Sequence, residues 1–210
     1  MHSIRHRLMI GAALSAALPA IAVAQNPPPA ATEVGASQLA MVDLLPTGMP
    51  RLNVTSPAFT QMSDIPMQNT QYAGNVFPGL HWTGGPGSTK SYAIIMQDGD
   101  AMRQGAPILH WTMVNIPAAT RTLDPGMTAA PDGSQFGPNM RGANQPYTGP
   151  RTPAGPKHRY HIQIFALDIV LPDVARADYG SLTAAMKGHV VAGGELVGLG
   201  QAPAPSGPGD

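Results

Sequence analysis

The sequence contains no cysteine, and it has few charged or aromatic residues. Without cysteine among its 210 residues, the chain has no disulfide, no thiol catalysis and no zinc–thiolate site. Charged residues make up 11% and aromatic residues 5% of the chain, whereas glycine and proline occupy 24 and 23 positions. This composition favours many short strands joined by turns over long, salt-bridged helices.

An excess of charge of one sign is absent as well. Twelve basic residues balance twelve acidic ones, which gives a formal net charge of +0. The charge balance therefore does not indicate binding to nucleic acid or to an anionic membrane surface. The length suits one domain with a real hydrophobic core.

A hydrophobic run long enough to cross a membrane is also missing from the N-terminus. The stretch MHSIRHRLMIGAALSAALPAIAVAQ has a basic start, an apolar run from Leu8 to Leu18 and small residues before Gln25. The apolar run is well short of the roughly 20 residues that span a bilayer. The pattern predicts a signal peptide over residues 1–24, cleaved after Ala24, and a periplasmic or secreted protein with no transmembrane segment after cleavage.

Two further segments are rich in Pro, Ala and Gly and have little to bury. Residues 25–38 are expected to form a flexible linker and residues 201–210 a flexible tail. The folded domain is expected over residues 39–200.

What remains is a series of short apolar or alternating segments bounded by Gly or Pro. Such punctuation is typical of a mostly β protein, a sandwich or barrel of antiparallel strands with a few short helices. Residues 181–188 predict one helix, with Ser181 as N-cap and Gly188 at its end, and residues 189–198 fit a strand or an irregular segment. The predicted strands are 51–56, 79–84, 91–98, 108–117 and 160–168.

Alternation along the three longest predicted strands puts polar groups on the same face as core-type residues. Arg159 and His161 fall on the opposite face of their strand and are not expected at a site. The three faces are Tyr92, Ile94, Met96 and Asp98; Ile108, His110, Thr112 and Val114; and His158, Tyr160, Ile162, Ile164 and Ala166.

Convergence of Asp98, His110, His158 and Tyr160 would make a polar pocket. Taken alone, His110 is typical of a buried structural histidine, and Asp98 of a turn cap beside Asp100. Together, the histidines and the phenol can donate hydrogen bonds to a phosphate-like anion, while the Asp98 carboxylate orients a histidine or shares a proton with the ligand. Binding should then strengthen at mildly acidic pH.

Other kinds of site are less well supported by the sequence. A metal site would have to gather Asp98, Asp100, His110 and His158 from separate strands, because no HxH or HExxH motif occurs. No GxSxG, SxxK or phosphate-binding GxxxxGK[ST] motif is present either. We therefore expect neither a metal nor another cofactor.

Four blocks of the sequence resemble the phosphatidylethanolamine-binding protein family, in its bacterial Raf-kinase-inhibitor-like branch of the YbhB/YbcL type. The resemblance covers roughly residues 50–198 and implies an antiparallel β-sandwich with a small cavity for anions such as phosphate, acetate or a phospholipid head group. The blocks are SPAF at 56–59 with FPGLHWTGGPGSTKSYAIIMQDGDA at 77–101, HWTMVNIPA at 110–118, YTGPRTPAGPKHRYHIQIFALD at 147–168 and GHVVAGGELVG at 188–198.

The resemblance also implies which residues line that cavity. They are Asp98 and Asp100, His110, His158 and Tyr160, with Tyr147, Gly149 and Pro150 as a wall.

The sequence departs from the family motifs at three positions. Gly99 and Met102 stand where the family's DPDAP motif has prolines, and Thr152 stands at a proline position of GPxPP. Gly99 is expected to loosen the loop that carries Asp98, and Met102 to make the rim more apolar and mobile.

The sequence thus predicts an exported, non-enzymatic protein that binds a small anion or a phosphorylated ligand. A kinase or protease as protein partner is implied by the resemblance alone. Two alternatives stay open: a hydrolase or lyase that uses a His–Asp pair of the same pocket as general base, and a pure interaction protein whose pocket has lost its ligand.

Overall fold

The structure is a computed structural model that describes residues 27–172, 174 and 176–204. The predicted signal peptide with its cleavage site, and the end of the predicted C-terminal tail, lie outside the described residues. In sequence order the elements are η1 Ala36–Gln38, α1 Ala40–Leu44, β1 Val54–Thr55, η2 Met67–Asn69, β2 Leu80–Trp82, β3 Ser91–Arg103, β4 Ala106–Pro117, β5 Thr122–Leu123, β6 Gln135–Phe136, β7 His158–Leu167, α2 Tyr179–Met186 and β8 Val190–Gly200.

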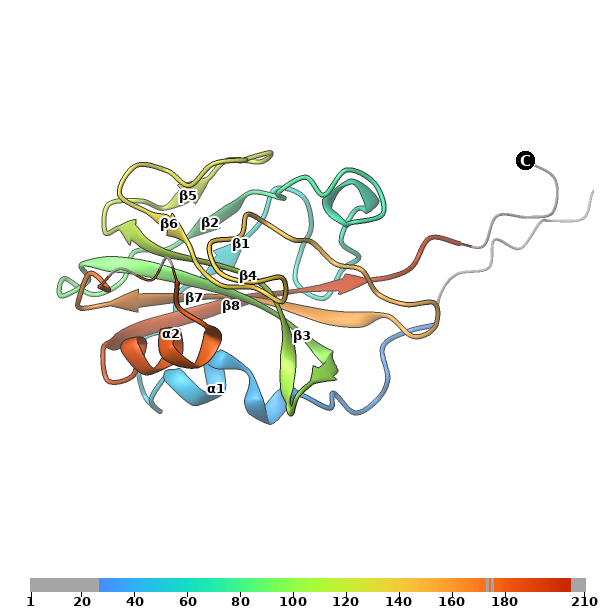
Figure 1. Cartoon of the computed structure of the whole chain (residues 1–210), viewed down its shortest axis with the longest axis horizontal. Coiled ribbons are helices and arrows are strands. Elements are labelled where there is room, and N and C mark those ends of the chain that lie inside the picture. Colours follow the sequence, from blue (N-terminus) through green and yellow to red (C-terminus); the bar gives the residue numbers. More distant parts are fainter. Residues whose placement is uncertain (1–26, 173, 175, 205–210) are drawn as a thin grey trace, which may run out of the picture.

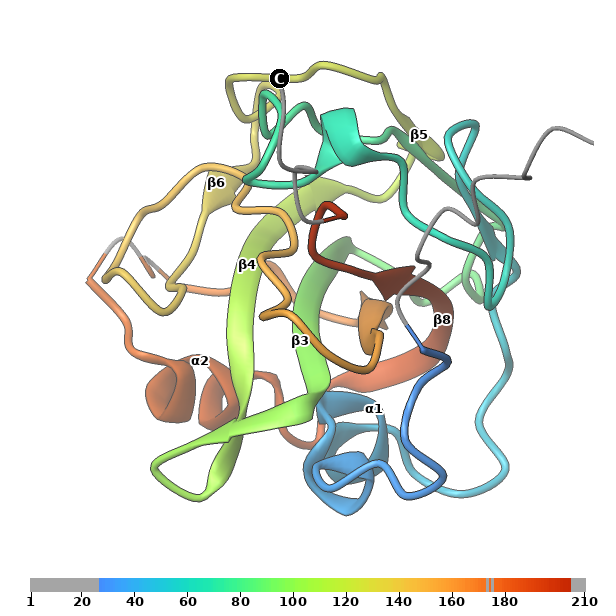
Figure 2. The ribbon, with the colours of Figure 1, turned by 90° about the vertical axis from the view of Figure 1, so that its right-hand side faces the viewer.

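The strands form two antiparallel sheets, which confirms the predicted fold class. The smaller sheet has the order β1-β2-β5 and the larger the order β6-β4-β3-β7-β8. In Figure 1 the small sheet lies on one side of the large sheet, and α1 and α2 lie on the other. The end-on view of Figure 2 shows β3 and β4 passing between these two layers.

Each face of the large sheet is buried in its own apolar cluster. On the side of the small sheet, Ile94, Met96, Ile162 and Ile164 pack with Trp82 and other residues of the loops and short strands. The second cluster joins the opposite face to the two helices and includes Ala93, Ile95, Phe165, Leu44 and Leu182. Because both faces are covered, β3 and β7 are almost continuously buried and not half-exposed.

The predicted faces of β3 and β7 are confirmed, whereas the predicted face of β4 is wrong. Trp111 and Met113 pack on the side of the small sheet, and Val114 packs on the helix side. Alternation fails because three register shifts interrupt the β3–β4 pairing. At one of them Met96 pairs with Trp111 but the next residue pairs with Leu109, so His110 is the extra residue of a β-bulge.

The helix predicted at 181–188 begins two residues earlier than expected. Its N-cap is Asp178, whose carboxylate accepts a hydrogen bond from the Ser181 backbone N–H, so Ser181 completes a capping box and is not the N-cap. Gly188 does lie just beyond the helix, with a φ of 84° that favours glycine. Residues 189–198, left open by the sequence, fall largely in β8.

The described part of the segment predicted as a flexible linker lies against the domain. Pro27 O accepts a hydrogen bond from Lys157 N at 3.2 Å, and Gly35 N donates to Gly99 O at 2.9 Å. Among the described residues, no helix is both long and apolar enough to cross a membrane.

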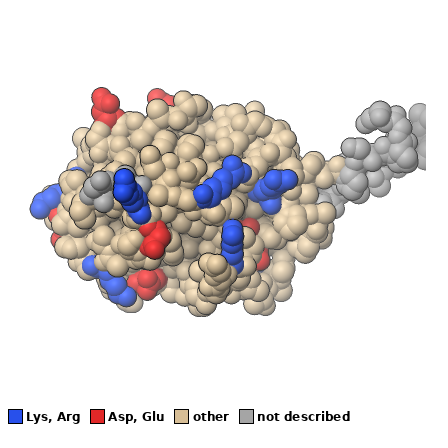
Figure 3. Space-filling model, viewed as in Figure 1, with Lys and Arg blue, Asp and Glu red and all other residues tan. Residues whose placement is uncertain are grey.

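The surface carries few charges, as the composition requires. Figure 3 shows one face of the molecule, on which single Lys, Arg, Asp and Glu side chains are separated by wide uncharged areas.

Candidate functional site

The centre of the candidate site is a pair formed by His158 and Asp98. His158 is the first residue of β7, and Asp98 lies on β3 directly beside Tyr160. Nδ1 of His158 lies 2.8 Å from Oδ2 of Asp98, with side-chain exposures of 15% and 4%. This hydrogen bond raises the pKa of His158, with a further contribution from the charge of Asp98, while partial burial opposes the shift.

Tyr160 lies behind this pair, deeper in the fold. Its hydroxyl forms a 3.0 Å hydrogen bond with Oγ1 of Thr152, and both side chains are buried. Burial, and next the charge of Asp98, raise the pKa of the phenol, so Tyr160 keeps its proton and can act as a donor. A side chain at Gly200 would overlap the Tyr160 ring, so this position of β8 must be a glycine.

His110 reaches the site because of the bulge in β4. Its ring meets that of Tyr160 edge to face, with centroids 5.0 Å apart. Nδ1 of His110 lies 3.1 Å from the Gly149 carbonyl and 3.3 Å from that of Thr148. Since carbonyl oxygens only accept, Nδ1 carries the proton, and burial lowers the pKa of this histidine, which leaves Nε2 as an acceptor.

Residues 147–150 form a wall of the site, held by a second loop. The Tyr147 hydroxyl donates to Asn69 O at 2.9 Å, and burial raises its pKa. Gly149 N donates to Asn75 Oδ1 at 2.7 Å, and Pro150 O accepts from Gln71 N at 2.9 Å. Tyr147 therefore offers no free hydroxyl, and its ring packs against Phe77 and Trp111 in the core.

Asp100, in contrast, turns away from the other predicted site residues. Its Oδ2 accepts a hydrogen bond from the backbone N of Arg159 at 2.7 Å and lies 3.4 Å from Nε of the same residue. Strict alternation would put Asp100 on the face of Asp98, but the β3–β4 register shifts between Asp98 and Met102. Burial raises the pKa of Asp100, while its contacts with Arg159 oppose this shift.

Two residues of the site were not identified as such from the sequence. Thr152, seen there only as a departure from a proline motif, supplies the hydrogen-bond partner of Tyr160. Glu33, in the segment expected to be flexible, has its carboxylate next to Arg159 and His161. Glu33 could not be identified because its partner Arg159 lies 126 residues away, and no strand periodicity links Thr152 to Tyr160, eight residues further on.

A separate cavity of about 490 Å³ contains none of the predicted site residues. It lies between the β3–β4 hairpin, residues 138–143 and the start of α2. Within the described part of the chain, no group of three or more His, Asp or Glu side chains is arranged to hold a metal ion.

The arrangement of the pair determines what it can do chemically. Because Nδ1 of His158 donates to Asp98, only Nε2 is left to face a ligand, and it donates a hydrogen bond when the ring is protonated. No described residue is hydrogen-bonded to this Nε2. Protonated His158 next to Asp98 thus offers a directed donor with little net charge, which suits a small anion.

A model of the phosphatidylethanolamine-binding protein family matches residues 55–201. The chain belongs to this family. By family and by fold it is therefore a protein of the phosphatidylethanolamine-binding type, as the sequence motifs predicted.

Relatives and solved structures agree with the family assignment. The UPF0098 protein of Methanothermobacter thermautotrophicus is 37% identical over 151 residues, which cover 70% of this chain and 97% of that protein. The UPF0098 protein YbhB of Escherichia coli K12 is 36% identical over 117 residues, 51% of this chain and 70% of YbhB.

Among solved structures, the phosphatidylethanolamine-binding protein homologue CT736 from Chlamydia trachomatis superposes with a TM-score of 0.66 at 29% identity, covering 73% of this chain and 99% of its own. YbcL of E. coli, described as a member of the mammalian family, shares the fold with a TM-score of 0.67 at 24% identity and the same coverage.

Proposed function

We propose that this member of the phosphatidylethanolamine-binding protein family is an exported, non-enzymatic protein that binds a small anion or a phosphorylated ligand, such as a phospholipid head group. Asp98, His110, His158 and Tyr160 form the binding cluster, with residues 147–150 as its wall. The observation that carries the proposal is the 2.8 Å pair of His158 and Asp98, in which Nδ1 of His158 is engaged and the His158 side chain keeps 15% exposure.

Arg141, near the cluster, adds to its preference for anions. The charge of Arg141 acts on His110, and its guanidinium is bonded to the neutral amide oxygen of Gln71 at 2.6 Å. Residues 133–167 contain no Asp or Glu, so no acidic side chain of this segment offsets the charge of Arg141.

The hydrolase or lyase alternative is less well supported by the same geometry. A general base must be deprotonated at working pH, but the contact with Asp98 raises the pKa of His158. Among the described residues, no serine or threonine hydroxyl is hydrogen-bonded to His158 as an activated nucleophile would be.

A phosphate titration followed by NMR tests the proposal. We expect saturable shifts at His158 and Tyr160 that weaken as the pH rises through the pKa of His158, above about 6.5, because the ring then loses its Nε2 proton. His158→Gln should abolish binding. Binding of equal strength at pH 6 and pH 9 would count against the site.

His189→Gln is the matched control for this experiment. Nδ1 of His189 lies 2.9 Å from Oδ1 of Asp168, so this pair resembles that of His158 and Asp98, but it lies at the opposite end of β7. Its replacement should leave phosphate affinity unchanged.

Export is tested separately, by mass spectrometry of the secreted or periplasmic protein, where a mature N-terminus at Gln25 is expected.

A further inference from the structure

The segment of residues 27–45, which we call the N-terminal strap, precedes the region that the family model matches. It nevertheless contacts residues 98–102 near the end of β3, which we call the Asp98 segment. Figure 1 shows it in blue, running along one end of the large sheet into α1. At its end, Ala40 N donates to Gln97 Oε1 at 2.8 Å, and Met41 N donates to Gln163 Oε1. These two glutamines are buried and bonded to each other at 2.9 Å, so the sheet itself caps α1.

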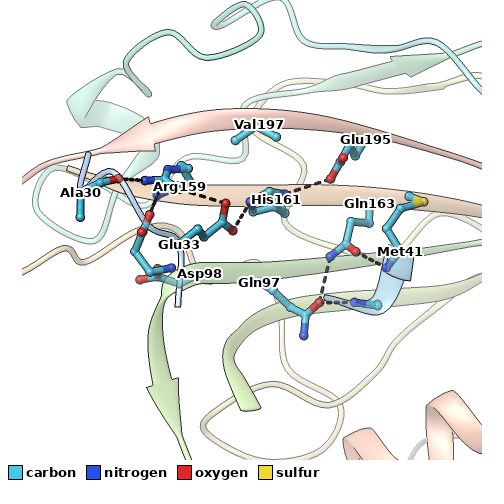
Figure 4. Close-up of polar contacts among 12 residues, drawn as sticks. Ala30, Glu33, Met41, Gln97, Asp98, Arg159, His161, Gln163, Glu195 and Val197 are labelled. Atoms are coloured by element: carbon cyan, nitrogen blue, oxygen red, sulfur yellow. Dashed lines mark hydrogen bonds and ion pairs between the residues drawn. The ribbon is translucent and has the colours of Figure 1, made fainter. Parts of the chain in front are cut away.

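Glu33 is the charged centre of the strap. Its Oε2 lies 3.1 Å from Nη1 of Arg159, and its Oε1 lies 2.7 Å from Nε2 of His161, as Figure 4 shows. The contact of Glu33 with His161 is an ion pair when His161 is protonated, and its two atoms are not aligned for a hydrogen bond. Arg159 also donates to the carbonyl of Ala30. A carboxylate with only 13% side-chain exposure needs such cationic partners.

The strap and the Asp98 segment fit each other through a glycine on each side. A side chain at Gly99 would overlap Oε1 of Glu33, and a Cβ at Gly35 would lie 3.0 Å from both the Gly99 carbonyl and the Met102 sulfur. Gly99 and Met102 are the two positions at which this segment departs from the family's DPDAP motif. Both departures thus lie where the strap makes contact.

Three consecutive residues of the Asp98 segment are held by different partners. Asp98 accepts from Asp100 N through Oδ1, at 3.0 Å, and contacts His158 through Oδ2. Gly99 O accepts from Gly35 of the strap. Asp100 accepts from the backbone of Arg159, whose guanidinium is bound by Glu33. The strap therefore holds the Asp98 segment at its backbone and through Arg159.

We propose that the N-terminal strap positions the Asp98 carboxylate against His158, and that Glu33 is the positioning residue through which it does so. As far as ligand affinity is concerned, the inference rests on the proposed function. The position of Asp98 itself can be measured without any ligand, because the contact with Asp98 is the main cause of the raised pKa of His158.

The first test is Glu33→Gln in the full-length chain, which removes the charge and keeps the size of the side chain. The deciding readout is the NMR titration of the His158 ring, and phosphate affinity is measured by calorimetry at pH 6. We expect the pKa of His158 to fall towards its ordinary value. Phosphate affinity should fall about three- to tenfold, because residues of one contact network are energetically coupled.

Asp43→Asn is the matched control, because Asp43 is an exposed carboxylate of the same strap whose cation, Lys187 Nζ, lies 3.8 Å away. It should change neither readout. An unchanged pKa of His158 in Glu33→Gln would overturn the proposal. If wild-type protein fails to bind phosphate, the proposed function is wrong, while the His158 titration still decides the role of the strap.

A second variant keeps every charge and disturbs only the fit. Gly99→Ala should lower the pKa of His158 as Glu33→Gln does, because the new methyl group displaces the Glu33 carboxylate. In a Glu33→Ala background the overlap is gone, so Gly99→Ala should have little further effect. The pKa of His158 is measured only on variants that retain the wild-type dispersion of amide signals. If the effects of the two changes simply add, the proposal is overturned.

Discussion

At the scale of single residues, the tautomers of His110 and His158 follow from their hydrogen-bond partners, which can only accept. His110 points its Nδ1 proton at backbone carbonyls, and His158 points its own at Asp98. The two rings therefore differ in role although they lie in one cluster: burial keeps His110 neutral, whereas the carboxylate favours the charged form of His158. His110 is therefore suited to the wall of the site, and His158 to contact with the ligand.

The hydroxyl of Tyr160 gives a stability prediction at this scale. Tyr160→Phe leaves the buried Thr152 hydroxyl without its 3.0 Å partner, so the free energy of unfolding should fall by about 1–3 kcal/mol. Urea denaturation measures this loss. In Tyr160→Phe with Thr152→Val both polar groups are gone, and the double variant should be less destabilised than the sum of the single ones. Additive losses would show that the hydrogen bond contributes nothing.

At the scale of elements, the strap is held by a histidine between two carboxylates. His161 faces Oε2 of Glu195 at 2.9 Å as well as Glu33, while its neighbours Gln97 and Val197 on the adjacent strands carry no charge. Burial opposes ionisation, but the hydrogen bond to Glu195 and the charge of Glu33 raise the pKa of His161. Arg159 contacts Glu33 from the other side, and Asp100 in turn contacts Arg159.

The strap should therefore open more readily at alkaline pH. Because the folded pKa of His161 is raised, its contribution to docking is complete below the ordinary value of about 6.5 and is lost as the pH rises through the folded pKa. Hydrogen-exchange protection factors of the Gly35 and Ala40 amides should fall between pH 6 and 9. In His161→Gln this pH dependence should be absent, and equal protection of the wild type at both pH values would contradict the prediction.

The element scale also shows how far the sequence could predict the fold. Strict alternation in β7 placed His158 and Tyr160 on one face and Arg159 and His161 on the other, and this holds because β7 pairs with β3 without a register shift. In β4 the same rule failed, because register depends on bulges that no hydrophobic pattern reveals. Asn115, with a φ of 57°, lies at one of them.

The strap could not be predicted for a different reason. Residues 27–38 bury few apolar side chains, so their composition resembles that of a disordered linker. They are held instead by backbone groups and by Glu33, whose partners lie more than 120 residues away. Contacts of this kind leave no local pattern in the sequence.

At the scale of the whole molecule, the histidines divide the pH dependence of stability into two limbs. Below about pH 6.5, the unfolded chain protonates His110 more readily than the folded protein does, so stability should fall as the pH decreases. Above that value, His158 and His161 hold protons that the unfolded chain has lost, so stability should fall as the pH increases. The free energy of unfolding should therefore be greatest near pH 6.5.

Urea denaturation between about pH 5.5 and 8.5 tests this prediction in a range that avoids most carboxylate titration. His161→Gln removes one of the two groups that define the alkaline limb, so the loss of stability above pH 6.5 should become shallower while the acid limb keeps its slope. An alkaline limb as steep as that of the wild type would mean that the Glu33–His161–Glu195 contact does not depend on the charge of His161. The strap would then be held by Arg159, by backbone hydrogen bonds and by the side chains of Gln97 and Gln163.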